Sequence, residues 1–296
     1  MLWCRMVGLY ASVNYHLHLP PLPGHCMSRC RPPRQDPEFR ELLPEECRHH
    51  RDRFREARYA ALADAEGFGA ICFALEALGL RLLGEQATLE RYKRRIKDRA
   101  LNSIVLAELT TSHPSRFKSF DALYKTVQTA RNDAMHIGAY ARHATEAAIE
   151  LCIGLEEALM ADVERTVDNV MVTSPMTVEK WQPVAHARQL MLMHSFSFLP
   201  VRIGESWWLL SELGLAKFLG VNVETKKTRL GQTVESAKAA GMEMVAVGND
   251  DLLRANMTID TVLQRAQIQS GPMLWLVVDD AHPESLAGVL SPFELM

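Results

Sequence analysis

The chain has 296 residues, of which 48% are hydrophobic and 23% are charged, and its net charge is −3. This composition is that of an ordinary folded protein, and the length is enough for two compact domains. No apolar run reaches the roughly 18–20 residues that a membrane-spanning helix needs. The first ten residues lack the basic start and the small-residue cleavage site of a signal peptide. We therefore expect a cytoplasmic protein with no membrane partner.

Residues 1–45 differ from the rest of the chain because prolines interrupt them. Two proline-rich runs, 20–23 and 31–34, break any regular element, so we expect an irregular or disordered arm. The arm contains five side chains of the types that bind zinc: His16, His18, His25, Cys26 and Cys30. They lack paired Cys-x-x-Cys spacing, so we predict no metal site.

Residues 46–161 have hydrophobic side chains at every third or fourth position and almost no proline, which predicts helices. The last helix carries one continuous apolar stripe, formed by Ala148, Leu151, Cys152, Leu155 and Leu159. A bundle of four or five helices accounts for this region. The expected helical segments lie near 51–65, 68–83, 87–109, 119–136 and 145–160.

The fourth of these segments ends in Arg131-Asn132-Asp133-Ala134-Met135-His136. A guanidinium and an imidazole are the groups needed to hold a phosphodiester and to move its protons. A five-residue step turns a straight α-helix by about 140°, so the two side chains converge only if the helix ends or bends between them. Gly138, just past the motif, is the type of residue that allows such a stop.

The pattern Arg131-Asn132-x-x-x-His136, followed by a helix, resembles the signature of the HEPN family, small helical bundles that include many metal-independent ribonucleases. The resemblance implies that His136 acts as acid or base, that Arg131 stabilises charge on the scissile phosphate and that Asn132 orients the pair. It also implies a homodimer with two facing motifs, and it leaves open a neutralising protein partner, as in a toxin–antitoxin pair. The alternative is an arginine paired with a carboxylate such as Asp133 and a histidine at a helix end.

A basic cluster lies earlier in the bundle. Residues 46–160 contain 17 Lys and Arg against 16 Asp and Glu, yet six cations crowd into nine residues: Arg91, Lys93, Arg94, Arg95, Lys97 and Arg99. Such a cluster can hold a phosphate backbone. We favour a solvated helix face paired with nearby carboxylates, because these residues point in several directions around a helix.

After residue 161 the sequence changes to short β-branched runs, prolines and single helices. A first copy of a strand–helix–strand–strand–helix pattern is marked by Val170-Met171, Leu199-Pro200-Val201 and Leu209-Leu210-Ser211. A second copy runs from Val245 to Leu295. The duplicated order resembles the CBS module, the nucleotide-sensing unit named after cystathionine β-synthase. The domains expected are 162–220 and 244–296 for the two copies, with 221–243 as a polar insertion.

In CBS modules a Ser or Thr at a strand end and an Asp three residues later hold the phosphate and ribose of adenine nucleotides. Helix-end N–H groups suit the anion and a carboxylate suits the ribose hydroxyls. The resemblance places Ser211 and Ser291 in this role, with Gly214 where the first acid is expected and Glu294 as the second. ATP, ADP or AMP is then a regulatory ligand. The alternative is a serine helix cap followed by an acidic residue in the first turn, which needs no ligand.

Two further features concern partners of the C-terminal half. Residues 161–296 contain 11 Lys and Arg against 16 Asp and Glu, so we expect no RNA-binding surface there. Trp207 and Trp208 alternate along a strand, which predicts one ring in the core and one at a surface suited to a dimer contact.

The sequence therefore predicts an α+β protein, with an N-terminal bundle of four or five helices followed by a tandem βαββα CBS pair. The function expected is a metal-independent endoribonuclease or RNA-binding effector that adenine nucleotides regulate and that needs no cofactor. The alternative is a non-catalytic nucleotide-sensing protein whose bundle serves for dimerisation or partner docking.

Overall fold

The structure is a computed structural model of the chain, and it describes residues 41–137, 142–266, 274–279, 281–282 and 284–296. The chain is α+β and divides into two compact units, with the boundary between Asp162 and Val163. Of the irregular arm expected at 1–45, residues 1–40 lie outside the described residues. Among the described helices, none is long and apolar enough to cross a membrane.

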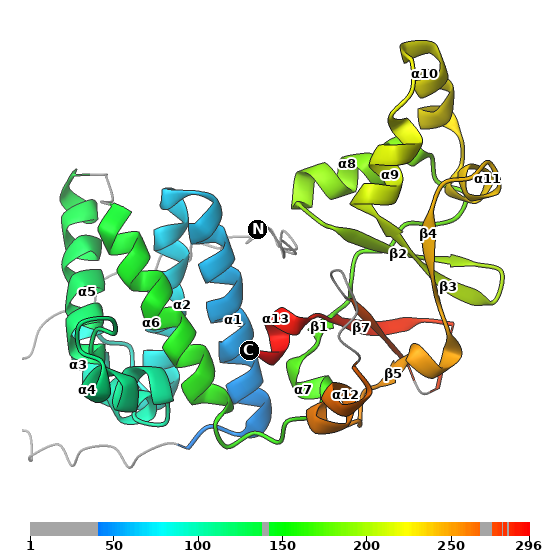
Figure 1. Cartoon of the computed structure of the whole chain (residues 1–296). Helices are drawn as coiled ribbons and strands as arrows, with labels where there is room; N and C mark the ends of the chain where they lie inside the picture. The colour runs from blue at the N-terminus through cyan, green and yellow to red at the C-terminus, as the bar shows by residue number, and fades with distance from the viewer. Residues whose placement is uncertain (1–40, 138–141, 267–273, 280, 283) are drawn as a thin grey trace, which may run out of the picture. The chain divides into compact units, whose positions relative to one another are not determined.

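The N-terminal unit is helical, and its longest helices run alongside one another (Figure 1). Its elements are α1 (Pro44–Ala63), η1 (Ala65–Gly67), α2 (Phe68–Leu83), α3 (Leu89–Ala100), η2 (Ile104–Glu108), α4 (Leu109–Ser112), α5 (Phe120–Ile137) and α6 (Arg142–Met160). One continuous core joins them, from Phe54 of α1 to Leu159 of α6. The expected stripe of α6 is fully buried in this core.

Two boundaries differ from the expected ones. Helix α1 begins at Pro44 instead of near 51, because proline suits the first helical position and the Glu46 carboxylate accepts the N–H of Leu43 at 2.9 Å. The single helix expected over 87–109 is broken after Ala100. Ser103 caps a new turn there, accepting the N–H of Leu106 at 3.0 Å, and a short π-helix follows.

The C-terminal unit alternates short helices and strands. Its elements in chain order are α7 (Val167–Val170), β1 (Val172–Thr173), α8 (Val184–His194), β2 (Phe198–Ile203), β3 (Ser206–Ser211), α9 (Glu212–Leu219), α10 (Val223–Gly231), α11 (Val234–Ala239), β4 (Met244–Val247), η3 (Asn249–Asp251), β5 (Leu253–Arg254), α12 (Ile259–Arg265), β6 (Trp275–Val278), β7 (Leu286–Leu290) and α13 (Pro292–Leu295). The strands form two sheets, ordered β1-β7-β6-β5 and β2-β3-β4.

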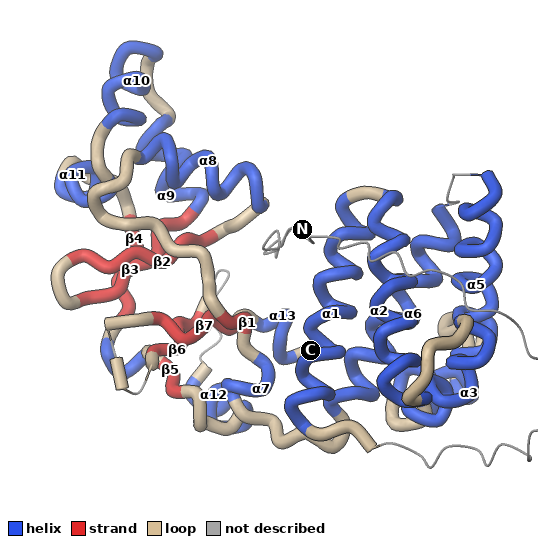
Figure 2. The backbone as a smooth tube through the Cα atoms, turned by 180° about the vertical axis from the view of Figure 1, so that it is seen from behind, coloured by secondary structure: helices blue, strands red, loops and turns tan. Residues whose placement is uncertain are grey.

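The two sheets face each other, and helices cover their outer faces (Figure 2). Alternation along the strands explains this layering, since successive side chains point to opposite faces. On β3, Trp207 and Leu209 pack between the sheets, whereas Leu210 packs toward α8 and α9. Three separate small cores result: one under α8, α9 and α11, one under α7 and α12, and one between the sheets.

The two halves of this unit exchange strands in the same way. Strand β1, from the first half, pairs with β7 of the second, while β4, from the second half, pairs with β3 of the first. The helices repeat the exchange, because Thr166 before α7 bridges Thr258 before α12, and Thr233 before α11 bridges Pro183 before α8. The unit therefore has a pseudo-two-fold arrangement in which neither half is complete alone.

This arrangement changes how two segments are assigned. The segment 221–243, expected to be a polar insertion, contains α10 and α11, and Val234 and Ala237 of α11 are fully buried. Helix α11 is the counterpart of α7, so the second copy begins near Thr233. The first strand was expected at Val170-Met171, but Val167–Val170 is a helical turn that packs against Ile259 and Leu290, and the strand begins at Val172.

Candidate functional site

Arg131 lies near the end of α5 and is held by a carboxylate from another helix. Its Nη2 donates to Oε1 of Glu76 on α2 at 2.8 Å. The two side chains are 40% and 31% exposed, so the guanidinium is anchored while part of it reaches solvent. The alternative considered for this motif was an arginine paired with a carboxylate such as Asp133, and the structure pairs Arg131 with the carboxylate of Glu76, 55 positions away.

Helix α5 continues through Arg131 to Ile137 without a break. The helix therefore does not end between Arg131 and His136, which was one of the two ways in which their side chains could converge. On this unbroken helix the two positions lie about 140° apart around the axis, so α5 alone does not turn them toward one point. Asn132 is exposed. The side chain of His136 and the residue Gly138 lie outside the described residues.

Buried Cys72 lies in the surroundings of Arg131. Burial raises the pKa of the Cys72 thiol to about 12, even though the positive charge of Arg131 favours the thiolate. A thiol with such a pKa stays protonated at neutral pH and is a poor nucleophile.

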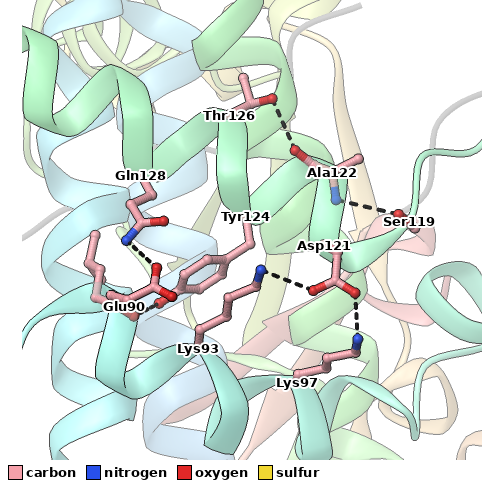
Figure 3. A network of polar contacts seen from close by, with 10 residues as sticks. Glu90, Lys93, Lys97, Ser119, Asp121, Ala122, Tyr124, Thr126 and Gln128 are labelled. Carbon is pink, nitrogen blue, oxygen red and sulfur yellow. Dashed lines mark hydrogen bonds and ion pairs between the residues drawn. The ribbon is translucent and has the colours of Figure 1, made fainter.

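The basic cluster on α3 is engaged with carboxylates (Figure 3). Lys93 contacts Asp121 of α5 at 3.2 Å, and Lys97 binds the other oxygen of the same carboxylate. These contacts lower the pKa of the Asp121 carboxyl, with the hydrogen bond from Lys97 as the largest cause. Arg91 pairs with Glu85 at 2.6 Å, and Arg99 pairs with Asp162 at 3.2 Å.

Figure 3 also shows how α3 and α5 are joined beside Asp121. Tyr124 of α5 donates to the carbonyl of Leu89 at 2.8 Å, and Gln128 donates to Glu90 at 2.8 Å, so α3 and α5 are joined along their length. These carboxylates lie outside α3: Asp121 is on α5, Glu85 precedes α3, and Asp162 follows α6. For Arg91, Lys93, Lys97 and Arg99 the structure favours a paired helix face over a phosphate-binding face.

Ser211 caps α9 at the end of β3. Its Oγ accepts the N–H of Gly214 at 2.9 Å. Gly214 itself is buried, and a Cβ built on it would lie 2.2 Å from the carbonyl oxygen of Glu243. The first copy therefore has glycine where an acid was expected because the backbone leading into β4 passes directly over this turn. An aspartate cannot be added there without moving that backbone.

Ser291 and Glu294 form a capping box at the start of α13. The Glu294 carboxylate accepts the backbone N–H of Ser291 at 2.8 Å and its hydroxyl at 2.5 Å, and Ser291 Oγ accepts the N–H of Phe293 at 3.3 Å. Ser291 is 2% exposed. These contacts are those of the helix-cap alternative for the two residues. For Glu294 to bind ribose hydroxyls, its carboxylate has to leave Ser291.

The adjacent tryptophans lie on opposite faces of β3. Trp207 is 7% exposed and packs between the sheets. Trp208 is half-buried on the helix side, where the Lys238 ammonium of α11 lies 3.5 Å from its ring centroid. The ring expected at a free surface is therefore covered by a cation of the same unit, in a cation–π contact.

The sequence reasoning missed one pair of polar residues. Arg202 lies directly opposite Trp207 in the β2–β3 hairpin. The Nε of Arg202 and the Nε1 of Trp207 are both buried and have no hydrogen-bond partner within the described part of the chain. A comparison of the two hairpins could have found them, because the second copy has Val278 where the first has Arg202. Among the described residues, no group of three or more His, Cys, Asp or Glu side chains could hold a metal ion.

No protein family profile and no curated protein sequence matches this chain. Several solved structures resemble part of it. The acetoin utilization protein AcuB from Vibrio cholerae is 11% identical, with 45% of this chain and 88% of that chain covered and a TM-score of 0.34. The CBS domain pair of protein MJ0100, solved with 5′-methylthioadenosine and S-adenosyl-L-methionine, is 15% identical, with 44% and 91% covered and a TM-score of 0.31.

A third similar structure is a hemolysin-like protein containing a CBS domain from Oenococcus oeni. It is 17% identical, with 45% of this chain and 88% of that chain covered and a TM-score of 0.30. Two of these three structures are named as CBS domain proteins. The similarity in each case extends over less than half of the present chain.

Proposed function

We propose that residues 163–296 form a CBS-type pair that binds an adenine nucleotide, and that the chain is a nucleotide-responsive regulatory protein. The observation that carries this proposal is the reciprocal strand exchange, in which β1 joins the second sheet and β4 joins the first. It places two equivalent helix starts, at Ser211 and Ser291, at the ends of equivalent strands. Duplicated strand ends of this kind suit a ligand that has both an anionic and a polar group.

The proposed nucleotide contacts are Ser291, Glu294 and Ser211, with ATP, ADP or AMP as the ligand. The two copies are not equivalent, since Gly214 supplies no carboxylate in the first. In the second, Glu294 exchanges its contacts with Ser291 for the ribose hydroxyls, so binding competes with helix capping. We expect one site per chain and a modest affinity.

Calorimetry with AMP, ADP and ATP on the full chain tests this proposal. The expected result is about one site per chain, weakened in Glu294→Gln, which keeps an acceptor for the cap but removes the charge. Glu284→Gln, an exposed glutamate of the same unit, is the matched control. Absence of binding for all three nucleotides at millimolar concentration would contradict the proposal and leave the unit as a dimerisation scaffold.

For the helical unit we propose a metal-independent RNA-cleaving or RNA-binding role centred on Arg131, Asn132 and His136. The supporting observation is the anchored but part-exposed guanidinium of Arg131, which Glu76 orients without covering it. Because α5 is unbroken between Arg131 and His136, the proposed site takes Arg131 from one chain and His136 from a second copy. A homodimer is thus part of this proposal.

RNA cleavage by the purified chain, with and without excess EDTA, tests this role. We expect cleavage that persists in EDTA and is lost in Arg131→Ala and in His136→Ala, with unchanged thermal stability. Arg116→Ala, at an exposed arginine of the same unit, is the control. Cleavage retained in either motif variant would overturn the assignment.

Measurements on the same purified chain distinguish RNA cleavage from RNA binding without cleavage. RNA binding without cleavage supports the alternative of a non-catalytic nucleotide-sensing protein whose bundle dimerises or docks a partner. Light scattering that shows a strict monomer at micromolar concentration would contradict the composite site. An adenine nucleotide that alters RNA affinity or cleavage several-fold would connect the two units, because such a change needs a ligand that binds two states unequally.

A further inference from the structure

Two buried hydrogen-bond donors in the C-terminal unit have no acceptor among the residues that the structure describes. They are the Nε of Arg202 on β2 and the Nε1 of Trp207 on β3. Trp207 is 93% buried, since its exposed fraction is 7%. Buried donors are nearly always satisfied, because an unpaired one costs about 1–3 kcal/mol. Two such donors in one place therefore require an explanation.

The two donors belong to the same surface. Arg202 and Trp207 are directly paired across the antiparallel strands, so their side chains project from the same face. That face is turned toward the other sheet, because Phe198 on β2 and Trp207 on β3 both pack with Leu276 and Val289. Among the described residues, no carboxylate forms an ion pair with Arg202.

The second copy shows that the fold does not need donors here. When Ser211 is matched with Ser291 at the helix starts, the strand pairings match Arg202 with Val278, whose partner across the hairpin is Leu286. This pair follows a register shift after Val277 that the first hairpin lacks, and both of its residues belong to the core between the sheets. An apolar pair is therefore sufficient for the packing, and the polar pair is specific to the first copy.

We propose that Arg202 and Trp207 form an oxyanion subsite between the sheets, which receives the phosphate or carboxylate group of the ligand bound by this unit. The proposal rests on the proposed adenosine ligand for the identity of the molecule that carries the anion. A guanidinium binds both kinds of anion through a planar set of N–H donors, and an indole N–H adds one neutral donor. A charge-assisted hydrogen bond in a dry site is stronger than one in water.

The subsite differs from the two serine caps because its donors are not already hydrogen-bonded to other groups among the described residues. Ser291 and Glu294 satisfy one another, and Ser211 accepts from Gly214, so the polar groups at both helix starts are already engaged. The Arg202 and Trp207 nitrogens need no rearrangement of existing hydrogen bonds before they bind a ligand. The hairpin therefore offers the anionic end of the ligand a set of donors in addition to the helix starts.

Calorimetry on the full chain with four probes tests the subsite: adenosine, AMP, S-adenosylmethionine and inorganic phosphate. AMP carries a phosphate, S-adenosylmethionine a carboxylate and adenosine neither. The variants are Arg202→Gln and Trp207→Phe, with Arg188→Gln, an exposed arginine on α8, and Trp208→Phe, on the other face of β3, as controls. Thermal unfolding of each variant shows that it is folded.

The expected result is that AMP or S-adenosylmethionine binds more tightly than adenosine, by about ten- to hundredfold, and that both subsite variants remove this advantage without changing the affinity for adenosine. If the variants weaken the binding of AMP, the subsite binds phosphate; if they weaken the binding of S-adenosylmethionine, it binds a carboxylate. Equal effects of a variant on adenosine and on the anionic ligand, or no effect on either, would overturn the subsite.

The inorganic phosphate experiment separates this proposal from the proposed function. If adenosine and its nucleotides do not bind but phosphate does, and Arg202→Gln abolishes phosphate binding, the subsite stands and the adenosine ligand is wrong. If nucleotides bind equally to the wild-type chain and to both variants, the adenosine ligand stands and the subsite is wrong. Binding of inorganic phosphate that is unchanged in Arg202→Gln and in Trp207→Phe would also overturn the subsite.

Discussion

Both units bury hydroxyl groups, but among the described residues the helical unit also buries ionisable side chains. In the helical unit His50 and Arg51 are 6% and 4% exposed, and Glu156 lies between Arg55 and Arg58 at the contact of α1 with α6. In the C-terminal unit the buried polar residues among those described are Ser197 and Ser291. Burying charge and burying hydroxyl groups have different consequences, because only charged groups respond to pH and to loss of a counter-ion.

The C-terminal unit is constrained instead by close backbone packing. A Cβ on Gly214 would lie 2.2 Å from the carbonyl oxygen of Glu243, and one on Gly288 would lie 2.8 Å from that of Val172. Both glycines lie where a strand from one half crosses the other half. We therefore expect charge and pH to control the stability of the helical unit, and side-chain volume to control that of the C-terminal unit.

The two units can be followed separately by their chromophores. The five tryptophans are Trp3, Trp181, Trp207, Trp208 and Trp275, so none lies within 41–162. Tryptophan fluorescence therefore follows the C-terminal unit, while far-UV circular dichroism is dominated by the longer helices of the other unit. The two signals therefore distinguish an effect on one unit from an effect on the other.

The largest effect is expected for Glu156→Gln. Arg58 donates to both oxygens of this carboxylate, at 2.7 and 3.1 Å, and both side chains are less than a fifth exposed. Burial opposes the charge of Arg58, but the hydrogen bond and charge of Glu156 outweigh it and raise the pKa of Arg58. Removing the carboxylate leaves a buried guanidinium without its counter-ion, which costs about 3–5 kcal/mol of unfolding free energy.

Urea unfolding followed by circular dichroism measures this loss. The control is Glu150→Gln on the same helix, whose contact with Lys118 at 3.6 Å is solvent-exposed and is expected to contribute less than about 1 kcal/mol. The fluorescence transition should be unchanged in both variants. Equal losses for the two substitutions would show that buried charge does not distinguish the helical unit.

The second effect is a pH dependence caused by His50. Burial is the main cause that lowers the pKa of His50 from 6.5 to about 4, and the charges of His49 and Arg53 add to it. Below pH 6.5 the unfolded chain gains a proton that the folded chain does not bind, so stability falls between pH 6.5 and about pH 4. The difference of pKa corresponds to at most about 3 kcal/mol.

His50→Gln should flatten this part of the stability curve, measured by urea unfolding at a series of pH values. His113→Gln, at an exposed histidine, is the control and should keep the slope of the wild-type chain. If the slope between pH 6.5 and 4 is the same with and without His50, buried charge at this position is not the source of the pH dependence.

The third effect concerns volume in the C-terminal unit. Gly214→Ala should lower its stability by about 1–3 kcal/mol, because the added carbon meets the backbone of Glu243, which cannot rotate away. Gly231→Ala at the end of α10 is the matched control, since a Cβ added there would meet no atom within 4 Å. The loss should appear in the fluorescence transition and not in circular dichroism of the helical unit.

Sequence periodicity was sufficient to predict the elements that depend on local patterns. The stripe of α6 from Ala148 to Leu159 is buried as expected, and the hairpins around Leu199 and Leu290 form where β-branched and apolar residues alternate. The helical turn Val167–Val170 was not predicted, because four residues contain too little of a helical repeat. It is held by pairing of Thr166 with the distant Thr258.

The candidate sites were less predictable because their partners are distant in the sequence. Glu76 reaches Arg131 from another helix, and Glu243 passes over Gly214 from a strand that starts 30 residues later. The expected second site at Ser291 and Glu294 follows a local sequence pattern, and that pattern fits both a ligand contact and a capping box. Only the three-dimensional contacts show that the two residues bind one another.

The smallest effect separates the two serine caps. Ser211→Ala removes one hydrogen bond, from the N–H of Gly214, and should cost about 1 kcal/mol. Ser291→Ala also removes the hydroxyl that donates to the Glu294 carboxylate, in a residue that is 2% exposed, so its cost should approach about 2 kcal/mol. Fluorescence-detected unfolding of both variants measures the difference. If Ser211→Ala loses more unfolding free energy than Ser291→Ala, the hydrogen bond between Ser291 and the Glu294 carboxylate contributes little to stability. That result would strengthen the case that the Glu294 carboxylate is available to a ligand.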